Sequence, residues 1–410
     1  MAQERIIVIG AGHAAGAFAD VVRKQGYEGE LLLIGEEAHS PYQRPPLSKA
    51  YLAGDMEAQR LSLRPDSFYE KKNIGLKLST KVSSIDVTAK SISTSDGETL
   101  PYNKLVIATG TRVRKLPVPG ADLEGVHYIR TIDDVAAVHA KWQQAKDIVI
   151  VGAGFIGLEV AAVAAKAGKK VTVLEGQDRV MPRVVAPVLS EFYEAYHHQN
   201  GVSIITGAGV VEISGTDRAE AVVCADGSRY QADIVIVGIG VVANVELGEA
   251  AGLKVDNGIV VDNTCRTSNE DIYAIGECAN HPDMRYGRLR LESVQNAQDQ
   301  AKVAAAALCG DPIAYDVVPW FWSEQFDLKL QMVGMSGGYD DIVMRGDMEA
   351  GKFSLLYYKR EHLIAIDSIN NAADHMAGRR LLAEGVSPNK TAVADASVKL
   401  KEFLARKPAV

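Results

Sequence analysis

Gly10-Ala11-Gly12-His13-Ala14-Ala15 follows the apolar run 5–9, and Gly152-Ala153-Gly154-Phe155-Ile156-Gly157 follows the apolar run 148–151. Both stretches have the Gly-x-Gly-x-x-Gly/Ala pattern of a strand-turn-helix junction. In this junction the first glycine permits a tight turn, the second lets the backbone approach a pyrophosphate, and the third packs helix on strand. The unpaired N–H groups of the helix N-terminus then face the phosphates. The repeated pattern predicts two dinucleotide sites.

The flanking sequence supports this prediction in both copies. Each motif opens an apolar helix, over about 13–25 and 155–167, and a second strand follows at 31–34 and at 170–174. These strands lead to Glu36 and Glu175, whose carboxylates are placed to accept hydrogen bonds from ribose hydroxyls. One copy alone could be an ordinary strand-helix turn with a surface acid. Two copies in the same context make that alternative improbable.

Composition indicates a globular enzyme of two to three domains. The chain has 410 residues and a net charge of −8, which argues against nucleic acid as a partner. Glu159 and three glycines interrupt the apolar stretch 148–165, so we expect a buried strand and helix there and no membrane span. No signal-peptide pattern is visible after Met1, so we expect a cytoplasmic protein.

The spacing of the cysteines excludes two kinds of site. Cys224, Cys265, Cys278 and Cys309 form neither a Cys-x-x-Cys redox pair nor a zinc or iron–sulfur motif, so we expect structural thiols and no bound metal. Many flavoenzymes with two dinucleotide sites pass electrons through a cysteine pair. This chain has none where such a pair would stand.

Two further segments carry local predictions. Pro45 and Pro46 prevent a regular strand, and Ser48 is placed to cap a helix that begins near Lys49. At 267–277 a short strand delivers Glu277 just before an expected helix.

The last 35 residues are basic. Residues 376–410 contain seven Lys and Arg against three acids. The positive charge favours two interpretations equally: a solvated, amphipathic terminal helix, or a docking patch for an acidic protein.

The order of several motifs resembles a known family. The motifs are GxGxxA at 10–15, PYxRPPLSK at 41–49, ATG at 108–110, GxGxxGLE at 152–159, GIG at 238–240 and TSxxxIYAxGE at 267–277. They are similar to those of pyridine nucleotide:flavin oxidoreductases of the glutathione-reductase structural class. Within that class the chain most resembles the FAD-dependent NADH:ferredoxin reductases of bacterial cytochrome P450 and ring-hydroxylating oxygenase systems, the putidaredoxin reductase-like group. The similarity extends to 292–297 and 319–323, and so covers nearly the whole chain.

The resemblance implies an α/β fold with two Rossmann-like three-layer domains and a smaller C-terminal α/β domain. It implies an FAD-binding domain at 1–112 and 242–318, an NAD-binding domain at 113–241, and a C-terminal domain at 319–410. The FAD positions carried over from the family are Gly10, Gly12, Ala14, Ala15, Glu36, Arg44, Lys49, Val82, Arg130, Glu277, Val294 and Trp322. The NADH positions are Gly152, Gly154, Ile156, Gly157, Glu159, Glu175 and Gly240. Glu277 departs from the family, which usually has Asp there.

The resemblance also implies a reaction in which NADH gives hydride to FAD and a [2Fe–2S] ferredoxin receives single electrons. The catalytic candidates are Lys49, beside the flavin ring, and Glu159, an acid directed toward the nicotinamide carboxamide that would pair with Lys49. Glu175 favours NADH because a carboxylate repels the 2′-phosphate of NADPH, although Arg179 is a cation close enough to oppose this preference.

The acidic ferredoxins of these systems give the basic segment a role. We expect docking near Lys302, Arg379, Arg380 and Lys401. Three alternatives remain open: a rubredoxin reductase, a monodehydroascorbate reductase, and an NADH-sensing scaffold similar to apoptosis-inducing factor.

Overall fold

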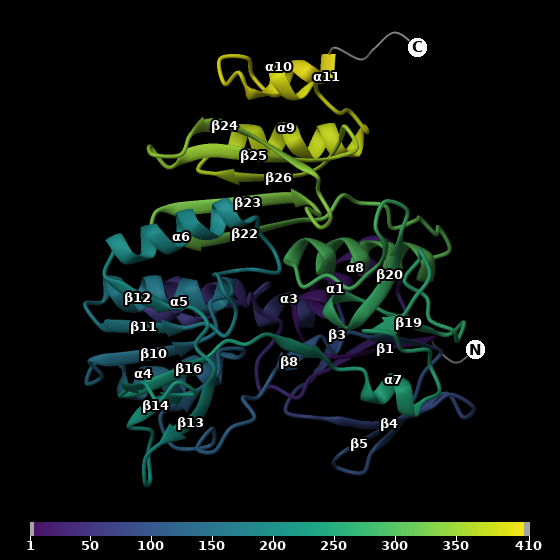
Figure 1. The fold of residues 1–410 in the computed structure, drawn as a ribbon. Helices are drawn as coiled ribbons and strands as arrows, with labels where there is room; N and C mark the ends of the chain where they lie inside the picture. Colours follow the sequence, from purple (N-terminus) through teal and green to yellow (C-terminus); the bar gives the residue numbers. More distant parts are fainter. Residues whose placement is uncertain (1–3, 406–410) are drawn as a thin grey trace. The chain divides into compact units, whose positions relative to one another are not determined.

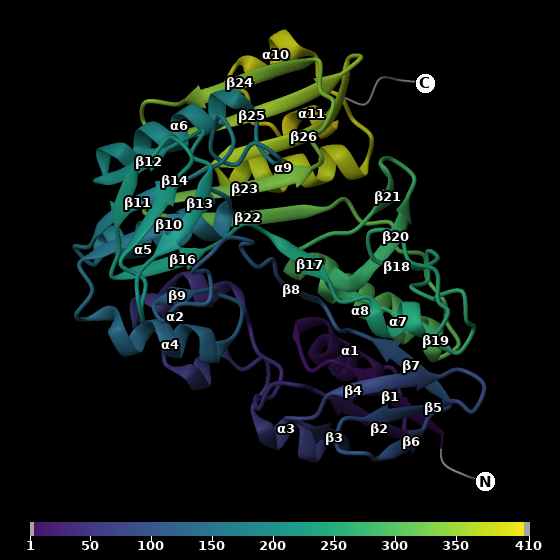
Figure 2. The ribbon, with the colours of Figure 1, turned by 60° about the horizontal axis from the view of Figure 1, so that its bottom comes forward.

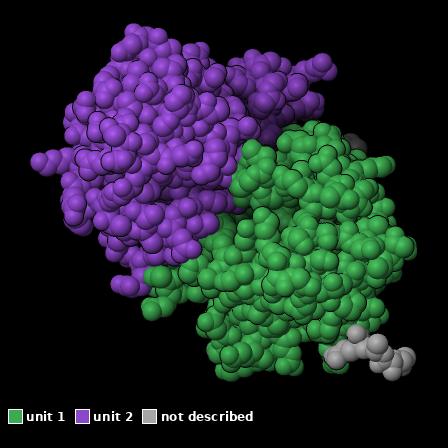
Figure 3. All heavy atoms as spheres, turned by 90° about the horizontal axis from the view of Figure 1, so that it is seen from below, with its two compact units in different colours: residues 1–44, 58–112, 242–317 green, residues 45–57, 113–241, 318–410 purple. Residues whose placement is uncertain are grey.

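The computed structural model describes residues 4–405 in two compact units (Figure 3). Among these residues, unit 1 comprises 4–44, 58–112 and 242–317, and unit 2 comprises 45–57, 113–241 and 318–405. Residues 45–57, which the sequence analysis placed in the first domain, thus belong to unit 2. The three predicted domains, and the assignment of each cofactor to one of them, stay a prediction.

Unit 1 is built on a five-stranded parallel sheet in the order β19-β7-β1-β2-β3. Its strands are β1 (Arg5–Ile9), β2 (Glu30–Ile34), β3 (Ile74–Lys77), β7 (Lys104–Ile107) and β19 (Ile272–Ala274). Helices α1 (His13–Lys24) and α8 (Val294–Leu308) cover one face, and the antiparallel strands β4 (Val82–Asp86), β5 (Ser91–Thr94) and β6 (Thr99–Pro101) cover the other. The result is a three-layer unit.

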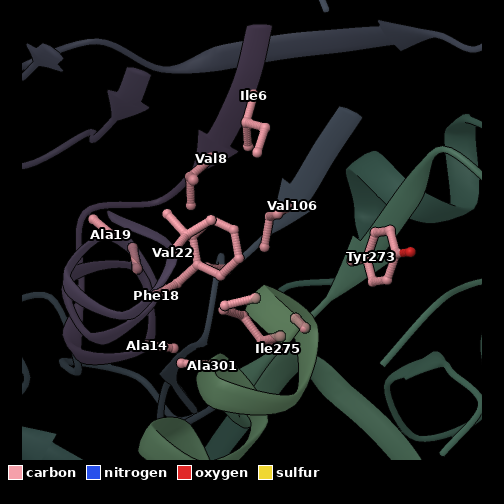
Figure 4. Close-up of a cluster of buried hydrophobic side chains, with 14 of the residues drawn as sticks. Ile6, Val8, Ala14, Phe18, Ala19, Val22, Val106, Tyr273, Ile275 and Ala301 are labelled. Atoms are coloured by element: carbon pink, nitrogen blue, oxygen red, sulfur yellow. The ribbon is translucent and has the colours of Figure 1, made fainter. Parts of the chain in front are cut away.

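The continuous apolar run of β1 follows from burial on both faces. Ile6 and Val8 belong to the core under α1 and α8, whereas Ile7 and Ile9 belong to the core against β4 and β5. Figure 4 shows the first core, in which the ring of Phe18 extends from α1 toward the strands. Strand alternation therefore distributes one apolar sequence between two cores.

Unit 2 repeats this architecture around the second motif. Its parallel sheet has the order β12-β11-β10-β16-β9 and can be followed in Figure 2. The elements of this part are β9 (Val126–His127), α4 (Ile132–Trp142), β10 (Asp147–Val151), α5 (Phe155–Lys166), β11 (Lys170–Leu174), α6 (Pro187–Gln199), β12 (Val202–Ile205), β13 (Val210–Ser214), β14 (Ala221–Cys224), β15 (Arg229–Gln231) and β16 (Ile234–Val237). Strands β13–β15 form a small antiparallel sheet, as β4–β6 do in unit 1.

Unit 2 also contains a five-stranded antiparallel sheet in the order β22-β23-β26-β25-β24. Its elements are β22 (Trp320–Gln325), β23 (Leu328–Gly334), β24 (Asp341–Asp347), β25 (Lys352–Lys359), β26 (His362–Ile369), α9 (Ala372–Ala383), α10 (Lys390–Ala394) and α11 (Glu402–Ala405). Helix α9 lies on one face of this sheet and α6 on the other (Figure 1). On the α6 face, the ring centroids of Phe192 and Phe353 are 5.0 Å apart.

The remaining elements are short connections. They are η1 (Pro45–Ser48), α2 (Ala50–Ala53), η2 (Ala58–Leu61), α3 (Asp66–Lys71), β8 (Thr111–Val113), β17 (Val241–Ala243), α7 (Glu246–Ala250), β18 (Ile259–Val260), η3 (Gly276–Cys278), β20 (Ala279–Asp283) and β21 (Gly287–Leu289). No helix within residues 4–405 is long and apolar enough to cross a membrane. The predicted α/β fold with two Rossmann-like units and a C-terminal α/β part is confirmed.

Two local predictions were wrong. Lys49 rather than Ser48 is the N-cap residue of the four-residue helix α2, because the Ser48 hydroxyl donates its hydrogen bond elsewhere. Glu277 lies within the three-residue 3₁₀ turn η3, and β20 follows it directly; the long helix α8 begins only at Val294.

Candidate functional site

The first cradle lies between β1 and α1 in unit 1. Gly10 has φ +117°, and a Cβ there would lie 2.3 Å from the carbonyl oxygen of Ala108, so only glycine can occupy the position. A Cβ on Gly12 would meet nothing within 4 Å. The backbone at Gly12 is therefore open to a ligand in front of α1.

The N-termini of α1 and α5 differ from those of three other long helices, although α6, which begins with Pro187, also has no side-chain cap. Gly12 and Gly154 are the N-cap residues of α1 and α5, and neither helix has a side-chain cap. By contrast α4, α8 and α9 are capped by Thr131, Ser293 and Asn371. The first N–H groups of α1 and α5 are left for a ligand, and two phosphate-bearing cofactors fit these positions.

Glu277 lies on a turn that packs against the first cradle. Gly276 has φ +79°, and a Cβ there would lie 2.9 Å from Cβ of Ala14 in the first turn of α1. The hydroxyl of Thr111 donates to Oε2 of Glu277 at 2.5 Å. The N–H of Gly276 donates to Oε1 of Gln300 at 2.7 Å. The fold thus brings the predicted third FAD element beside the first.

The other predicted FAD residues of unit 1 have varied surroundings. Glu36 is exposed beyond the end of β2, and Arg44 donates to Glu37 at 2.5 Å. Ala14 and Ala15 are buried in α1, Val82 is buried in β4, and Val294 is the first residue of α8. The predicted residues Lys49, Arg130 and Trp322 belong to unit 2.

The second cradle lies between β10 and α5 in unit 2. Gly152 has φ +104°, and a Cβ there would lie 2.5 Å from the carbonyl oxygen of Gly238. A Cβ on Gly157 would lie 2.0 Å from the carbonyl oxygen of Gly152, whereas one on Gly154 would meet nothing within 4 Å. Ile156, in the first turn of α5, is 43% exposed. The three glycines thus have the three roles that the motif predicts.

Glu175 closes the same cradle from the end of β11. Its carboxylate accepts from the N–H of Ala153 at 2.7 Å and from the N–H of Gln177 at 2.9 Å. Gly240, with φ +100°, lies three residues beyond the end of β16, which pairs with β10 on the side opposite β11. Both residues follow carboxyl ends of parallel strands, where open α/β sheets bind their ligands.

Arg179, the cation that could oppose the preference for NADH, is bound by three acceptors of unit 2. Its guanidinium donates to the carbonyl oxygens of Val185 and Pro182 and to the hydroxyl of Ser190, at 2.6–2.9 Å. The cation that could have attracted a 2′-phosphate is therefore engaged in holding the loop before α6.

Lys49 and Glu159 form an ion pair within unit 2. Nζ of Lys49 lies 2.6 Å from Oε2 of Glu159, whose side chain is 2% exposed. Two hydroxyls also donate to the carboxylate: Ser48 to Oε2 at 2.5 Å, and Ser323 to Oε1 at 2.7 Å. Burial of a carboxylate is costly, and these three donors offset the cost. Neither serine was among the predicted site residues, although Ser48 stands in the motif at 41–49 and Ser323 in the family-like segment 319–323. Nothing in these motifs links either serine to Glu159.

The predicted docking residues fall in both units. Lys302, in unit 1, lies 2.7 Å from Asp299, whereas Arg379, Arg380 and Lys401 belong to unit 2. The guanidinium of Arg379 lies 5.0 Å from the ring centroid of Trp320, which is 5.6 Å from that of Trp322.

The basic segment is not one terminal helix. Residues 376–405 comprise the end of α9, then α10 and α11. Arg406 and Lys407, which also contribute to the positive charge, lie outside the described residues.

Metal and disulfide chemistry have no visible site in the described part of the chain. No group of His, Cys, Asp and Glu in residues 4–405 could hold a metal ion. The four cysteines are free; Cys309 is exposed and the other three are buried.

Two parallel sheets, each with a glycine cradle that leads into a helix without a side-chain cap, indicate an oxidoreductase of the class that uses two dinucleotides. The chain belongs to the pyridine nucleotide-disulphide oxidoreductase family, whose model matches residues 4–301; a model described as reductase C-terminal matches residues 320–404. The predicted use of FAD and a nicotinamide dinucleotide is thereby confirmed.

Relatives cover the whole chain. It is 44% identical to rhodocoxin reductase of Rhodococcus erythropolis over 403 residues, which span 98% of this chain and 94% of the relative. The ferredoxin reductase for the CYP199A2 system of Rhodopseudomonas palustris has a TM-score of 0.95 at 43% identity and covers 97% of this chain and 99% of its own. The covalent putidaredoxin reductase–putidaredoxin complex gives a TM-score of 0.97 at 39% identity, with 100% of both chains covered.

Proposed function

We propose that the protein takes a hydride from NADH onto FAD and passes single electrons to a [2Fe–2S] ferredoxin that supplies a cytochrome P450 or related oxygenase. The observation that carries this proposal is the full-length likeness to putidaredoxin reductase, a reductase solved in covalent complex with putidaredoxin. FAD, when bound, converts the two-electron donor NADH into a source of single electrons. The chain's own residues bind, orient and select the reactants.

FAD is assigned to the cradle of unit 1 and NADH to the cradle of unit 2. Open space at Gly12 and the turn that brings Glu277 to α1 support the first assignment. Open space at Gly154 and the position of Glu175 support the second. The other residues named for each cofactor in the sequence analysis are proposed to contact it, and the three predicted domains are proposed on the same basis.

Lys49 and Glu159 are the proposed catalytic residues. Lys49, beside the flavin ring, would stabilise the negative charge that the ring gains on reduction. Glu159 would accept a hydrogen bond from the nicotinamide carboxamide, and its charge is held by Lys49 and two serines. The pair would therefore connect coenzyme orientation to charge at the flavin.

NADH is the proposed coenzyme, because Glu175 places a carboxylate where a 2′-phosphate would need a cation, and Arg179 is occupied elsewhere. Ferredoxin is proposed to dock on a basic surface that includes Lys302, Arg379, Arg380 and Lys401. We further propose that the protein works in the cytoplasm.

Anaerobic stopped-flow absorbance tests this function. The FAD-loaded protein is mixed with NADH, and the reduced protein is then mixed with a [2Fe–2S] ferredoxin, with a rubredoxin and with monodehydroascorbate. Rapid flavin reduction followed by rapid reoxidation by ferredoxin is the expected result. If rubredoxin or monodehydroascorbate reoxidises the flavin faster than ferredoxin does, that acceptor replaces ferredoxin in the proposal. Reduced flavin that persists with every acceptor would favour an NADH-sensing scaffold.

A further inference from the structure

Strand β22 presents alternate residues to the second cradle. The ring centroids of Phe321 and Phe155, the first residue of α5, are 4.9 Å apart. Two residues further along β22, Ser323 donates to Glu159, one turn later in α5. The strand thus follows α5 from the glycine turn to the buried acid, and Ser323 is fully buried at this contact.

The next residue on the same face continues the hydrogen bonds. Nε2 of Gln325 donates to Oγ of Ser323 at 3.2 Å, and Oε1 of Gln325 lies 2.8 Å from Nε2 of His197 in α6. Burial lowers the pKa of His197 to about 4, so its ring is neutral at pH 7. All three side chains are buried.

The chemistry of the groups sets the direction of the hydrogen bonds in this series. A carboxylate has no proton to give, so the single hydroxyl proton of Ser323 must point to Glu159. Ser323 then accepts from the amide N–H of Gln325, which turns the amide oxygen toward His197 and places the His197 proton on Nε2. Every donor therefore points toward Glu159, and aligned hydrogen bonds of this kind polarise one another.

The two carboxylate oxygens of Glu159 are held from different elements. Ser48, the last residue of η1, and Lys49, the N-cap residue of α2, hold Oε2, whereas Ser323 holds Oε1 from β22. We propose that Ser323, oriented by Gln325 and His197, is a positioning residue for the coenzyme, which fixes the Glu159 carboxylate to receive the nicotinamide carboxamide. This inference rests on the role proposed above for Glu159.

A fixed carboxylate helps binding because less side-chain freedom remains to be lost when the ligand arrives. Without the Ser323 hydroxyl, Oε1 loses a donor and the side chain gains rotamers while Lys49 still holds Oε2. We therefore expect Ser323→Ala to weaken nicotinamide binding more than it slows the reaction of bound coenzyme.

The binding probe is 1,4,5,6-tetrahydro-NADH, which keeps the carboxamide but cannot donate a hydride. Isothermal titration of the FAD-loaded protein should give an affinity about five- to tenfold lower for Ser323→Ala, and an intermediate value for Ser323→Cys, whose thiol is a weaker donor. KM for NADH should rise in the same order while kcat changes less. Glu324→Gln, on the opposite, exposed side of β22, is the matched control and should bind as the wild type does.

The results for the Ser323 variants and for Glu159→Gln distinguish the role of Ser323 from that of Glu159. Wild-type affinity in Ser323→Ala would overturn the inference, as would equal losses in Ser323→Ala, Ser323→Cys and Glu324→Gln. Melting temperatures of all variants identify a loss due to unfolding, and Ser323→Cys then provides the comparison because its volume is close to that of serine. Glu159→Gln tests the underlying function: unchanged affinity in that variant would overturn the role of Glu159, whereas reduced affinity there with no effect of Ser323→Ala would overturn only the inference about Ser323.

Discussion

Lys49 and Glu159 are 110 positions apart in the chain, and their side chains meet at 2.6 Å, with the carboxylate 2% exposed. An ion pair as buried as this one gives less stability than its short distance suggests, because both groups lose hydration. The ion pair also lies one helical turn beyond the open cradle at 152–157, so it can have a role besides stability. Charge fixed at this point is available to a reactant that enters the cradle.

Glu159→Gln is expected to weaken NADH binding and slow flavin reduction, each by about tenfold or more, because the amide removes the negative charge and leaves Lys49 without its partner. Stopped-flow reduction at several NADH concentrations separates the two effects. Glu191→Gln, at an exposed position of α6, is the control and should leave both unchanged. Unchanged binding and reduction in Glu159→Gln would remove Glu159 from the mechanism.

Glu175→Gln is expected to reduce the preference for NADH over NADPH. The amide oxygen can still accept from a backbone N–H, but the repulsion of a 2′-phosphate is lost. The ratio of kcat/KM for the two coenzymes should fall by about tenfold, which corresponds to about 1.4 kcal/mol. Asp178→Asn, an exposed acid three residues further along the chain, is the control for loss of charge alone. An equal change in both variants would indicate a general effect of surface charge.

Thr111→Val is expected to weaken FAD retention, because Glu277 then loses the hydroxyl that donates to Oε2. If Thr111 holds this longer acid where the family usually has Asp, the effect should largely disappear in the Glu277→Asp background. FAD dissociation constants of the apoprotein for both single variants and the double variant give the coupling, expected at about 1 kcal/mol. Additive effects of the two substitutions would show that the hydrogen bond does not serve FAD binding.

Arg379→Glu and Arg380→Glu are expected to raise KM for an acidic ferredoxin and to reduce its salt dependence, because rim charges act mainly on association. Arg379 should have the larger effect, since it also lies over Trp320. Lys352→Glu, at the exposed start of β25, makes the same change of net charge outside α9 and is the control. Equal effects of all three substitutions would indicate attraction by net charge without a defined docking surface.

The sequence predicted the parts of the site that depend on the backbone. Gly10 and Gly152 have positive φ, and a Cβ on either would clash with the carbonyl oxygen of the residue that follows a neighbouring strand. Such positions accept only glycine, so their spacing is visible in one sequence. The parallel strands were predictable for a related reason, because burial on both faces leaves continuous apolar runs.

The supporting side chains could not be predicted in this way. Ser48, Ser323 and Thr111 each donate one hydroxyl to an acid distant in sequence, and many exposed serines and threonines have the same local surroundings. The helix cap assigned to Ser48 shows the difficulty, because local sequence favoured a cap and tertiary packing directed its hydroxyl to Glu159. The C-terminal sheet and the second cradle likewise form one unit through contacts that no motif encodes.

Asp367→Asn is expected to stabilise the protein above pH 7 and to change little near pH 4. Burial raises the pKa of Asp367 from 3.8 to about 7, although the Tyr357 hydroxyl, which donates at 2.6 Å, opposes the shift. The folded state therefore keeps a proton that the unfolded state releases, and the wild type loses stability as pH rises from about 4 to 7.

In Asp367→Asn, the amide can accept the hydrogen bond from Tyr357 without this cost. Chemical denaturation at several pH values should give a difference in the free energy of unfolding between variant and wild type that grows over this interval to roughly 4 kcal/mol, because the pKa moves from 3.8 to about 7. Glu349→Gln, an exposed acid near β25, should give no such trend, and a constant difference at all pH values in Asp367→Asn would contradict a buried neutral carboxyl.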